Sequence, residues 1–306
     1  MRNDLIALMT YKPKNRKNYL TINSADQKWG LAINSVGHQS ISENEVYPPN
    51  VHPTRYLFNV ENGRTLSEYQ LLYITKGRGT FCSKSAGKFS VKEGHMFLLF
   101  PGEWHTYKPD ENTGWNEYWI GFNGKFVDEW VSSGFLSKEN PVFKIGLNEE
   151  VISLYNRAIV IAEAQEASYQ QALSGITCNL VSMAIYLSRN LSFNKSDIAS
   201  QINLAKIAVL DNINDITPEE LARITCMSYS KFRKIFKEYT GFAPSQYIQE
   251  VRINMAKEML TNTSKSIKEI AFELGYENKD YFFTVFKKIT GTTPISYRVY
   301  TQGTAE

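Results

Sequence analysis

Cysteine and histidine are scarce in this sequence. It has three cysteines, Cys82, Cys178 and Cys226, which lie far apart. Cysteine-rich metal sites need closely spaced ligand pairs and disulfide scaffolds need many cysteines, so the sequence predicts neither. The four histidines are also dispersed, at positions 38, 52, 95 and 105. Widely scattered thiols without a disulfide framework are typical of a protein from a reducing cytoplasm, which is where we expect this one.

Long hydrophobic runs are also missing. No segment approaches the roughly 18 apolar residues that a membrane span requires, so we expect no membrane partner. The apolar run in the N-terminal stretch MRNDLIALMTYKPK is too short for a secretory signal. A net charge of +3 over 306 residues gives no global basic signal. The length favours two domains, and a hydrophobic content of 42% is enough to fill their cores.

The first 25 residues are polar, with a basic cluster at Lys12, Lys14, Arg16 and Lys17. Basic N-terminal segments are most often disordered, and we expect the same of this N-terminal arm, residues 1–25.

Residues 26–147 have the pattern of a β domain. Short runs that alternate in polarity and are rich in aromatics indicate strands at Gly30–Val36, Glu68–Thr75, Gly79–Ser83, Lys88–Val91, His95–Phe100 and Glu117–Phe122. Turn signals at 76–79, 92–94 and 101–102 separate them and predict three hairpins. Many short strands with such turns indicate a jelly roll or a small barrel.

The stretch from Gly94 to His105 resembles the second half of a cupin barrel. Metal-dependent cupins, as that resemblance implies, carry a His-x-His pair with a nearby Glu on an early strand. The corresponding stretch, Glu68–Lys76, contains no histidine. A site with two histidines and one carboxylate needs three converging ligands, and only His105 lies at a suitable position. We therefore predict no metal and no cofactor.

Residues 148–190 indicate two helices, at about Glu149–Glu166 and Tyr169–Leu187, each with apolar residues at helical spacing. They could pack on the β domain or form a dimer contact. Residues 191–201 are polar and rich in Ser and Asn, which favours a linker. A helix at Asn203–Asn212 then opens a C-terminal domain, residues 202–306.

The C-terminal domain contains one pattern twice. Ala222 and Ala271 are 49 residues apart (271 − 222), whereas Phe236 and Phe286 are 50 apart (286 − 236). The second copy therefore has one extra residue in its central turn. A repeat at this period marks a duplicated supersecondary unit.

Each copy has the pattern of a helix-turn-helix. A short helix (Glu219–Thr225 or Ile267–Leu274) precedes a tight turn at Cys226-Met227 or Gly275-Tyr276. Gly275 suits a turn that needs positive φ, and Cys226 fits it less well. The second helix of each copy begins at an N-cap, Ser228 or Asn278, and ends at a Thr-Gly pair. A ligand-free helical bundle is the alternative.

The two second helices are locally basic and carry the residues that we expect to contact DNA. Residues 228–239 hold four basic residues against one acidic residue. A positive surface opposite the apolar stripe favours phosphate contact. We expect base readers and N-cap residues in the first half of each helix, and backbone anchors at Lys237 and Lys287. The DNA-facing set is Ser228, Tyr229, Ser230, Arg233, Lys234, Lys237, Asn278, Lys279, Asp280, Thr284 and Lys287.

The second copy, from Ile267 through Gly275-Tyr276, Phe286-Lys287, Gly291 and Pro294 to Tyr297-Arg298, closely resembles the signature of the AraC-type transcription regulators. The helix between the copies, with Arg252, Ala256 and Leu260 on one side, resembles that family's linker helix. The resemblance implies that both second helices enter successive major grooves of double-stranded DNA, roughly 34 Å apart. It also implies dimerisation through residues 148–190, and offers a second role for the N-terminal arm, folding over the ligand or the DNA-binding domain.

The same resemblance implies a ligand site in the β domain. Arg64, His105, Tyr107 and Trp119 correspond to positions where sugar-sensing members hold their ligand. Arginine can donate to adjacent hydroxyls, and the flat face of Trp119 suits a pyranose ring. The rival interpretations are that Tyr107 and Trp119 are ordinary core and that Arg64 forms a surface salt bridge.

These expectations combine into an α+β protein of two domains. A cupin-like barrel or jelly roll with two following helices precedes an all-α tandem helix-turn-helix domain. We expect a ligand-responsive transcription regulator that is a homodimer, with a carbohydrate effector and RNA polymerase as a further candidate partner. The alternatives are a cupin-fold enzyme such as an isomerase and a methyl-transferring DNA repair regulator. The latter needs a zinc-bound cysteine cluster.

Overall fold

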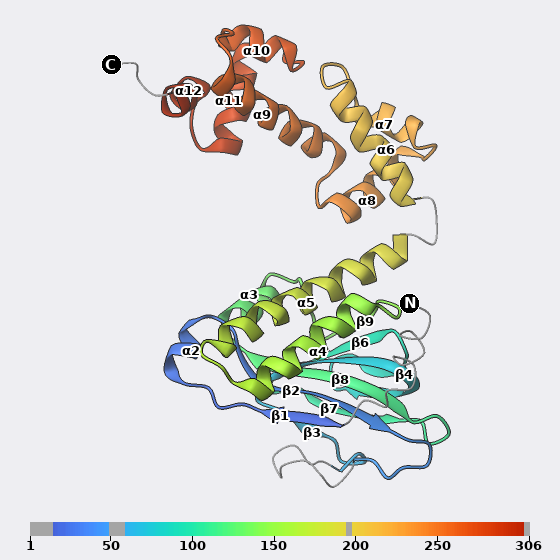
Figure 1. Cartoon of the computed structure of the whole chain (residues 1–306). Coiled ribbons are helices and arrows are strands. Elements are labelled where there is room, and N and C mark those ends of the chain that lie inside the picture. The colour runs from blue at the N-terminus through green and yellow to red at the C-terminus, as the bar shows by residue number, and fades with distance from the viewer. Residues whose placement is uncertain (1–14, 49–58, 194–197, 303–306) are drawn as a thin grey trace, which may run out of the picture. The chain divides into compact units, whose positions relative to one another are not determined.

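A computed structural model gives the fold, and it describes residues 15–48, 59–193 and 198–302 (Figure 1). The chain divides into two compact units, residues 1–192 and residues 193–306. The first is built around a β-sheet and the second is helical. This confirms the predicted α+β class.

The strands of the first unit are antiparallel and run in the order β1-β2-β8-β4-β6-β9, with β3, β5 and β7 paired outside this path. That path is open, so within the described residues the sheet does not close into a barrel. The nine strands are β1 (Arg16–Tyr19), β2 (Ala32–Ile41), β3 (Arg64–Thr65), β4 (Tyr69–Ser83), β5 (Gly87–Lys92), β6 (His95–Leu99), β7 (Trp104–Pro109), β8 (Trp115–Asn123) and β9 (Val142–Lys144).

Strand β4 links two groups of strands. Its first half pairs with β6 and β8, and its second half pairs with β5 and β7. The register with β8 shifts between Ile74 and Lys76, and Gly77 there has a φ of 79°. The predicted hairpin at 76–79 is therefore wrong, because its glycines allow the strand to bend and continue rather than reverse.

Two long helices cover one face of the sheet, α4 (Glu149–Ala164) and α5 (Tyr169–Phe193) (Figure 1). The hydroxyl of Tyr155 donates to the carbonyl of Leu71 over 3.0 Å. The side-chain amide of Gln170 both accepts from and donates to the backbone of Ile33, at 2.9 and 3.0 Å. These buried bonds join the helices to the sheet and so favour packing on the β domain for at least this face of the pair.

The N-terminal segment is ordered where the structure describes it. Strand β1 pairs with β2, and a short helix α2 (Ser24–Lys28) follows. The disorder expected for residues 1–25 is therefore wrong for these elements, while residues 1–14 lie outside the described part. Helix α3 (Lys125–Ser132), which follows β8, has no counterpart among the predicted elements.

The second unit has seven helices in its described part. They are α6 (Ile198–Asp211), α7 (Pro218–Ile224), α8 (Tyr229–Thr240), α9 (Pro244–Asn262), α10 (Ile267–Glu273), α11 (Lys279–Thr290) and α12 (Pro294–Gln302). Helices α5 and α6 extend into the expected linker 191–201, of which residues 194–197 lie outside the described part. No helix that the structure describes is long and apolar enough to cross a membrane.

Candidate DNA interface and ligand site

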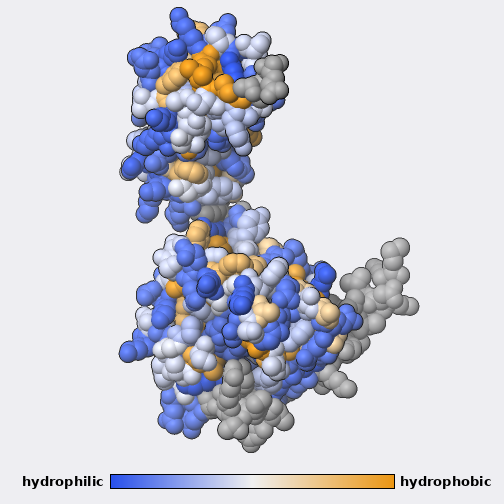
Figure 2. Space-filling view, turned by 90° about the vertical axis from the view of Figure 1, so that its left-hand side faces the viewer, coloured by the Kyte–Doolittle hydropathy of each residue, from blue (hydrophilic) through white to orange (hydrophobic). Residues whose placement is uncertain are grey.

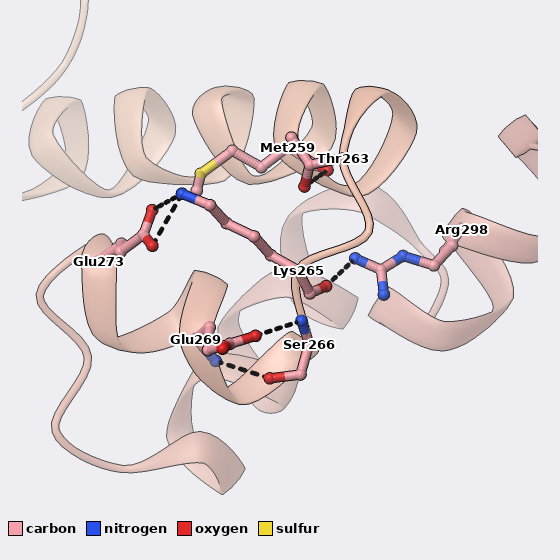
Figure 3. Close-up of polar contacts among 7 residues, drawn as sticks. All are labelled: Met259, Thr263, Lys265, Ser266, Glu269, Glu273 and Arg298. Atoms are coloured by element: carbon pink, nitrogen blue, oxygen red, sulfur yellow. Dashed lines mark hydrogen bonds and ion pairs between the residues drawn. The ribbon is translucent and has the colours of Figure 1, made fainter.

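The two helix-turn-helix copies begin with the same device. Thr217 accepts from the backbone N–H of Glu220, whose carboxylate accepts from the N–H of Thr217 in return. Ser266 and Glu269 repeat this reciprocal cap at the start of α10, with bonds of 2.7 and 3.2 Å (Figure 3). Each cap satisfies two backbone donors that the helix start would otherwise leave unpaired.

The turns of the two copies share a backbone conformation but differ in sequence. Gly275 has a φ of 74° and Cys226 a φ of 53°. A Cβ on Gly275 would lie 2.1 Å from the carbonyl oxygen of Asn214, so only glycine fits. One residue, Met227, separates Cys226 from the next N-cap, whereas Tyr276 and Glu277 separate Gly275 from Asn278. This confirms the position of the extra residue in the second turn.

Helices α8 and α11 are anchored alike. The pairs Phe232/Phe236 and Phe282/Phe286 are buried, with ring centroids 5.1 and 5.7 Å apart. Both helices end at a glycine with positive φ, Gly241 or Gly291. The shared anchors hold the opposite surface of each helix toward solvent, where DNA can reach it.

The second copy is fixed to the helix that joins the copies (Figure 3). Lys265 forms an ion pair with Glu273 at 2.6 Å, and Arg298 donates to the carbonyl of Lys265, also at 2.6 Å. The hydroxyl of Thr263 donates to the carbonyl of Met259 at the end of α9. The Nε of Arg298 also donates to the carbonyl of Leu260 on α9 over 3.3 Å, so that these bonds join α9, α10 and α12.

All eleven residues predicted to face DNA are exposed: Ser228, Tyr229, Ser230, Arg233, Lys234, Lys237, Asn278, Lys279, Asp280, Thr284 and Lys287. The two helices differ in the local contacts that these side chains make. Asn278 accepts from two backbone N–H groups of α11, while Ser228 makes no side-chain cap bond. Thr284 donates to the carbonyl of Asp280, and the Lys279 ammonium lies 5.3 Å from the centroid of the Phe283 ring. Among the described residues, more of the predicted DNA-facing side chains take part in local contacts on α11 than on α8.

In the first unit, three of the four predicted ligand residues come together around β3 and β7. Arg64 is the register partner of His105, and its guanidinium donates to the hydroxyl of Tyr107 over 2.9 Å. The rings of His105 and Tyr107 are nearly parallel, with centroids 6.3 Å apart. Arg64 thus has a buried partner, and the alternative of a surface salt bridge does not describe its contact with Tyr107.

Burial keeps His105 neutral. It is 1% exposed, and desolvation followed by the charge of Arg64 lowers its pKa to about 4. Its Nδ1 lies 3.0 Å from the carbonyl oxygen of Glu103. Its Nε2 is buried without a hydrogen-bond partner in the described part of the chain, which leaves it available to an added polar ligand.

Trp119 occupies the same interior cluster as Tyr107, together with Phe97 and Trp115. It is 6% exposed, and its ring covers Gly37, where a Cβ would lie 2.4 Å from the indole. Gly37 is the register partner of Trp119 on β2. The contact supports a packing role for Trp119.

Sequence reasoning missed Glu117. Its side chain follows Trp115 and precedes Trp119 at alternate positions of β8, so the three share one face of the strand. Glu117 is 4% exposed, and burial raises its pKa to about 7, against the lowering effects of Arg64 and Lys17. The Trp-x-Glu-x-Trp alternation was the available signal, because it places a carboxylate between two aromatic rings.

Lys17 is the second missed residue. It lies on β1 opposite Gly37. Burial lowers the pKa of the Lys17 ammonium, and the charge of Glu117 offsets part of this lowering. The neighbouring Arg16 points the other way and forms an ion pair with Glu163 on α4. The described residues contain no group of three or more His, Cys, Asp or Glu that could hold a metal ion.

Comparison with protein families finds two matches on this chain. The family described as "AraC-like ligand binding domain" matches residues 59–177, and the family described as "Helix-turn-helix domain" matches residues 221–299. The first range contains the Arg64–His105–Tyr107 cluster and the second contains both α8 and α11.

Relatives with assigned roles match most of the chain. The raffinose operon transcriptional regulatory protein RafR of Pediococcus pentosaceus is 25% identical over 249 residues, covering 79% of this chain and 88% of that protein. The lactose operon transcription activator of Staphylococcus xylosus is 25% identical over 249 residues, covering 78% and 87%. The arabinose operon regulatory protein of Salmonella typhimurium is 24% identical over 250 residues, covering 79% and 87%.

Proposed function

This chain belongs to the AraC-type transcription regulators, and from that premise we propose that it senses a carbohydrate and reads DNA with both helix-turn-helix copies. Its relatives are regulators of transcription, so the chain is a regulator rather than a cupin-fold enzyme. The proposal assigns sensing to residues 26–147, dimerisation to residues 148–190 and DNA binding to residues 202–306.

One observation carries the DNA side of the proposal. Both α8 and α11 bury a phenylalanine pair and present every predicted DNA-facing residue to solvent. Base-edge readers such as Arg233 enter a major groove, and Lys237 and Lys287 hold the phosphates on either side. One hydrophobic core contains the phenylalanine pairs of both α8 and α11, which supports the reading of two successive grooves by one unit.

The carbohydrate assignment rests on the interior of the first unit. Arg64 and Tyr107 supply donors, His105 a neutral imidazole, and Trp119 an apolar ring. A sugar offers adjacent hydroxyls and an apolar C–H face, which this combination complements. The relatives named for raffinose, lactose and arabinose operons support the same class of ligand.

The functional unit in this proposal is a cytoplasmic homodimer. Helices α4 and α5 keep exposed apolar side chains, Val160 and Tyr186, on surfaces that do not face the sheet. The helical unit also exposes a patch of apolar residues (Figure 2), and its exposed apolar side chains include Leu204, Ile207, Leu210, Phe272, Ile295 and Val299. Such surfaces mark partner contacts, and RNA polymerase is the partner we propose for the helical unit.

In this proposal, the ligand controls DNA binding because its affinity differs between two arrangements of the protein. A ligand that binds one arrangement of sensor, β1 segment and DNA-binding unit more tightly than another shifts the population toward that arrangement. Two contacts of the β1 segment support this proposal: the charge of Glu117 acts on Lys17, and Arg16 forms an ion pair with Glu163 on α4.

A thermal-shift screen of the full chain against raffinose, lactose and L-arabinose tests the carbohydrate assignment. A ligand that binds only the folded state raises the melting temperature, by an amount that grows with its concentration above Kd. Tryptophan fluorescence assigns the shift, because all five tryptophans (positions 29, 104, 115, 119 and 130) lie in the first unit. No shift with any sugar of a wider mono- and oligosaccharide panel would contradict sugar sensing while leaving DNA binding to be measured separately.

A further inference from the structure

Glu117 is a buried carboxylate with two cations acting on it. Its register partners are Gln39 on β2 and Ile74 on β4, so it sits in the middle of the sheet rather than at an edge. One of its carboxylate oxygens, Oε2, is buried and makes no hydrogen bond of normal geometry in the described residues, although the indole N–H of Trp115 acts on this carboxylate and lowers its pKa. A buried carboxylate with an unmet acceptor is costly, and such a group calls for a functional reason.

The charges around Glu117 come from different strands. Arg64 on β3 and Lys17 on β1 are the cations that favour its ionised form. The charge of Glu117 in turn raises the pKa of the hydroxyls of Tyr47 and Tyr107. Glu45 also acts on Lys17, but it is exposed and its effect is smaller than that of Glu117. Glu117 is therefore a buried carboxylate that acts on both cations.

We propose that Glu117 makes the sensor select its ligand by charge. The carboxylate neutralises Arg64 and Lys17, so that the site binds an uncharged polyol and rejects sugar acids. The inference rests on the proposed carbohydrate function and adds the selecting residue to it. The unmet Oε2 accepts from a ligand hydroxyl, and Arg64 donates to a neighbouring hydroxyl oxygen.

The electrostatics give the direction of selection. The carboxylate of a sugar acid placed beside Arg64 would face the carboxylate of Glu117 in a site with little water to screen them. Without Glu117 the site would lose the buried carboxylate that acts on Arg64 and Lys17. A guanidinium in that state is a strong partner for a ligand carboxylate, because it can donate two parallel hydrogen bonds.

The test compares the full wild-type chain with Glu117→Gln, and uses Glu93→Gln, an exposed change, as the matched control. The probes are raffinose, lactose and L-arabinose against D-galacturonate and D-glucuronate, titrated at pH 8, where Glu117 is ionised. We expect the wild type and Glu93→Gln to prefer a neutral sugar by about tenfold or more, and Glu117→Gln to reverse that preference. A Glu117→Gln protein that keeps the neutral preference would overturn the proposal.

A second variant decides the matter even if no sugar binds. In Glu117→Ala the lost carboxylate leaves space beside Arg64 and Lys17, and acetate should fill it. We expect acetate, compared with chloride at equal ionic strength, to raise the melting temperature of Glu117→Ala but not that of the wild type. Absence of this acetate effect would overturn the charge-balancing role. Absence of all sugar binding together with a clear acetate effect would instead contradict the carbohydrate function alone.

Discussion

The guanidinium of Arg64 donates to the hydroxyl of Tyr107 across 2.9 Å, and its central carbon lies 5.7 Å from the centroid of the same ring. This pair joins the short strand β3 to β7 and holds the arginine fork inside the cluster. Tyr107→Phe removes the hydrogen bond but keeps the ring. We expect a loss of about 1 kcal/mol in unfolding free energy and a much larger fractional loss of ligand affinity, since Arg64 is no longer oriented. Urea unfolding and ligand titration measure the two, and an unchanged ligand affinity would contradict this role of Arg64.

Trp119 gives a contrasting expectation. Because its ring covers Gly37 and packs with Phe97 and Tyr107, Trp119→Ala should cost about 3–5 kcal/mol and unfold much of the sensor. Trp119→Phe keeps part of the packing and should leave a folded, DNA-binding protein with a weakened ligand response. Thermal melting with and without ligand separates these effects. A stable Trp119→Ala variant that only loses ligand response would show that the ring serves the ligand and not the core.

The raised pKa of Glu117 predicts a pH effect with a definite sign. Between pH 4.5, its ordinary pKa, and about 7, the folded state holds a proton that the unfolded state has lost. Stability should therefore fall as pH rises through this window, by about 3 kcal/mol for a shift of this size. Glu117→Gln should lack this fall.

The measurement is urea unfolding from pH 4.5 to 8, followed by tryptophan fluorescence. The difference between wild type and Glu117→Gln isolates Glu117. It removes the opposite effect of His38 and His105, whose lowered pKa values make stability fall as the pH drops below 6.5. A difference that does not change with pH would contradict the assignment.

The two turn residues predict opposite effects. Cys226 holds a φ of 53° that favours glycine, so Cys226→Gly should stabilise the helical unit by up to about 1 kcal/mol. Gly275→Ala should destabilise the unit by more than that, because the new Cβ meets the backbone oxygen of Asn214. Thermal melting, followed by the helical signal in circular dichroism, measures the stability change of both variants. Equal effects of the two changes would mean that the turns do not share this conformation.

The helical unit was predictable because its signals are local. Helix caps, apolar spacing and Thr-Gly ends lie within a few residues of each other. Because the same pattern occurs twice, the interpretation of each copy supports that of the other. Even the positive φ at Cys226 followed from its match to Gly275. The lengths of α5 and α6 were not predictable, because polar Ser and Asn residues at 191–201 are compatible with either a linker or helix ends.

The sheet was harder to predict because its structure depends on distant pairs. The two glycines at 77 and 79 look like a hairpin, yet they bend one strand that changes partners. Lys17 and Glu117 are 100 residues apart (117 − 17), and only the pairing of β1, β2 and β8 brings them onto one face. Arg64, His105 and Tyr107 were found by resemblance, whereas the buried carboxylate of Glu117 needed the structure.

The most direct test of the central claim is selection of binding sites by the full chain from random double-stranded DNA. Tandem reading by α8 and α11 predicts enriched sites with two conserved base blocks about one helical turn apart. Arg233→Ala should relax one block at a cost of roughly 1–3 kcal/mol in binding, and the sugar found in the thermal screen should shift the affinity for the selected site. A single conserved block, or an Arg233→Ala effect equal on all sequences, would contradict base reading by both helices.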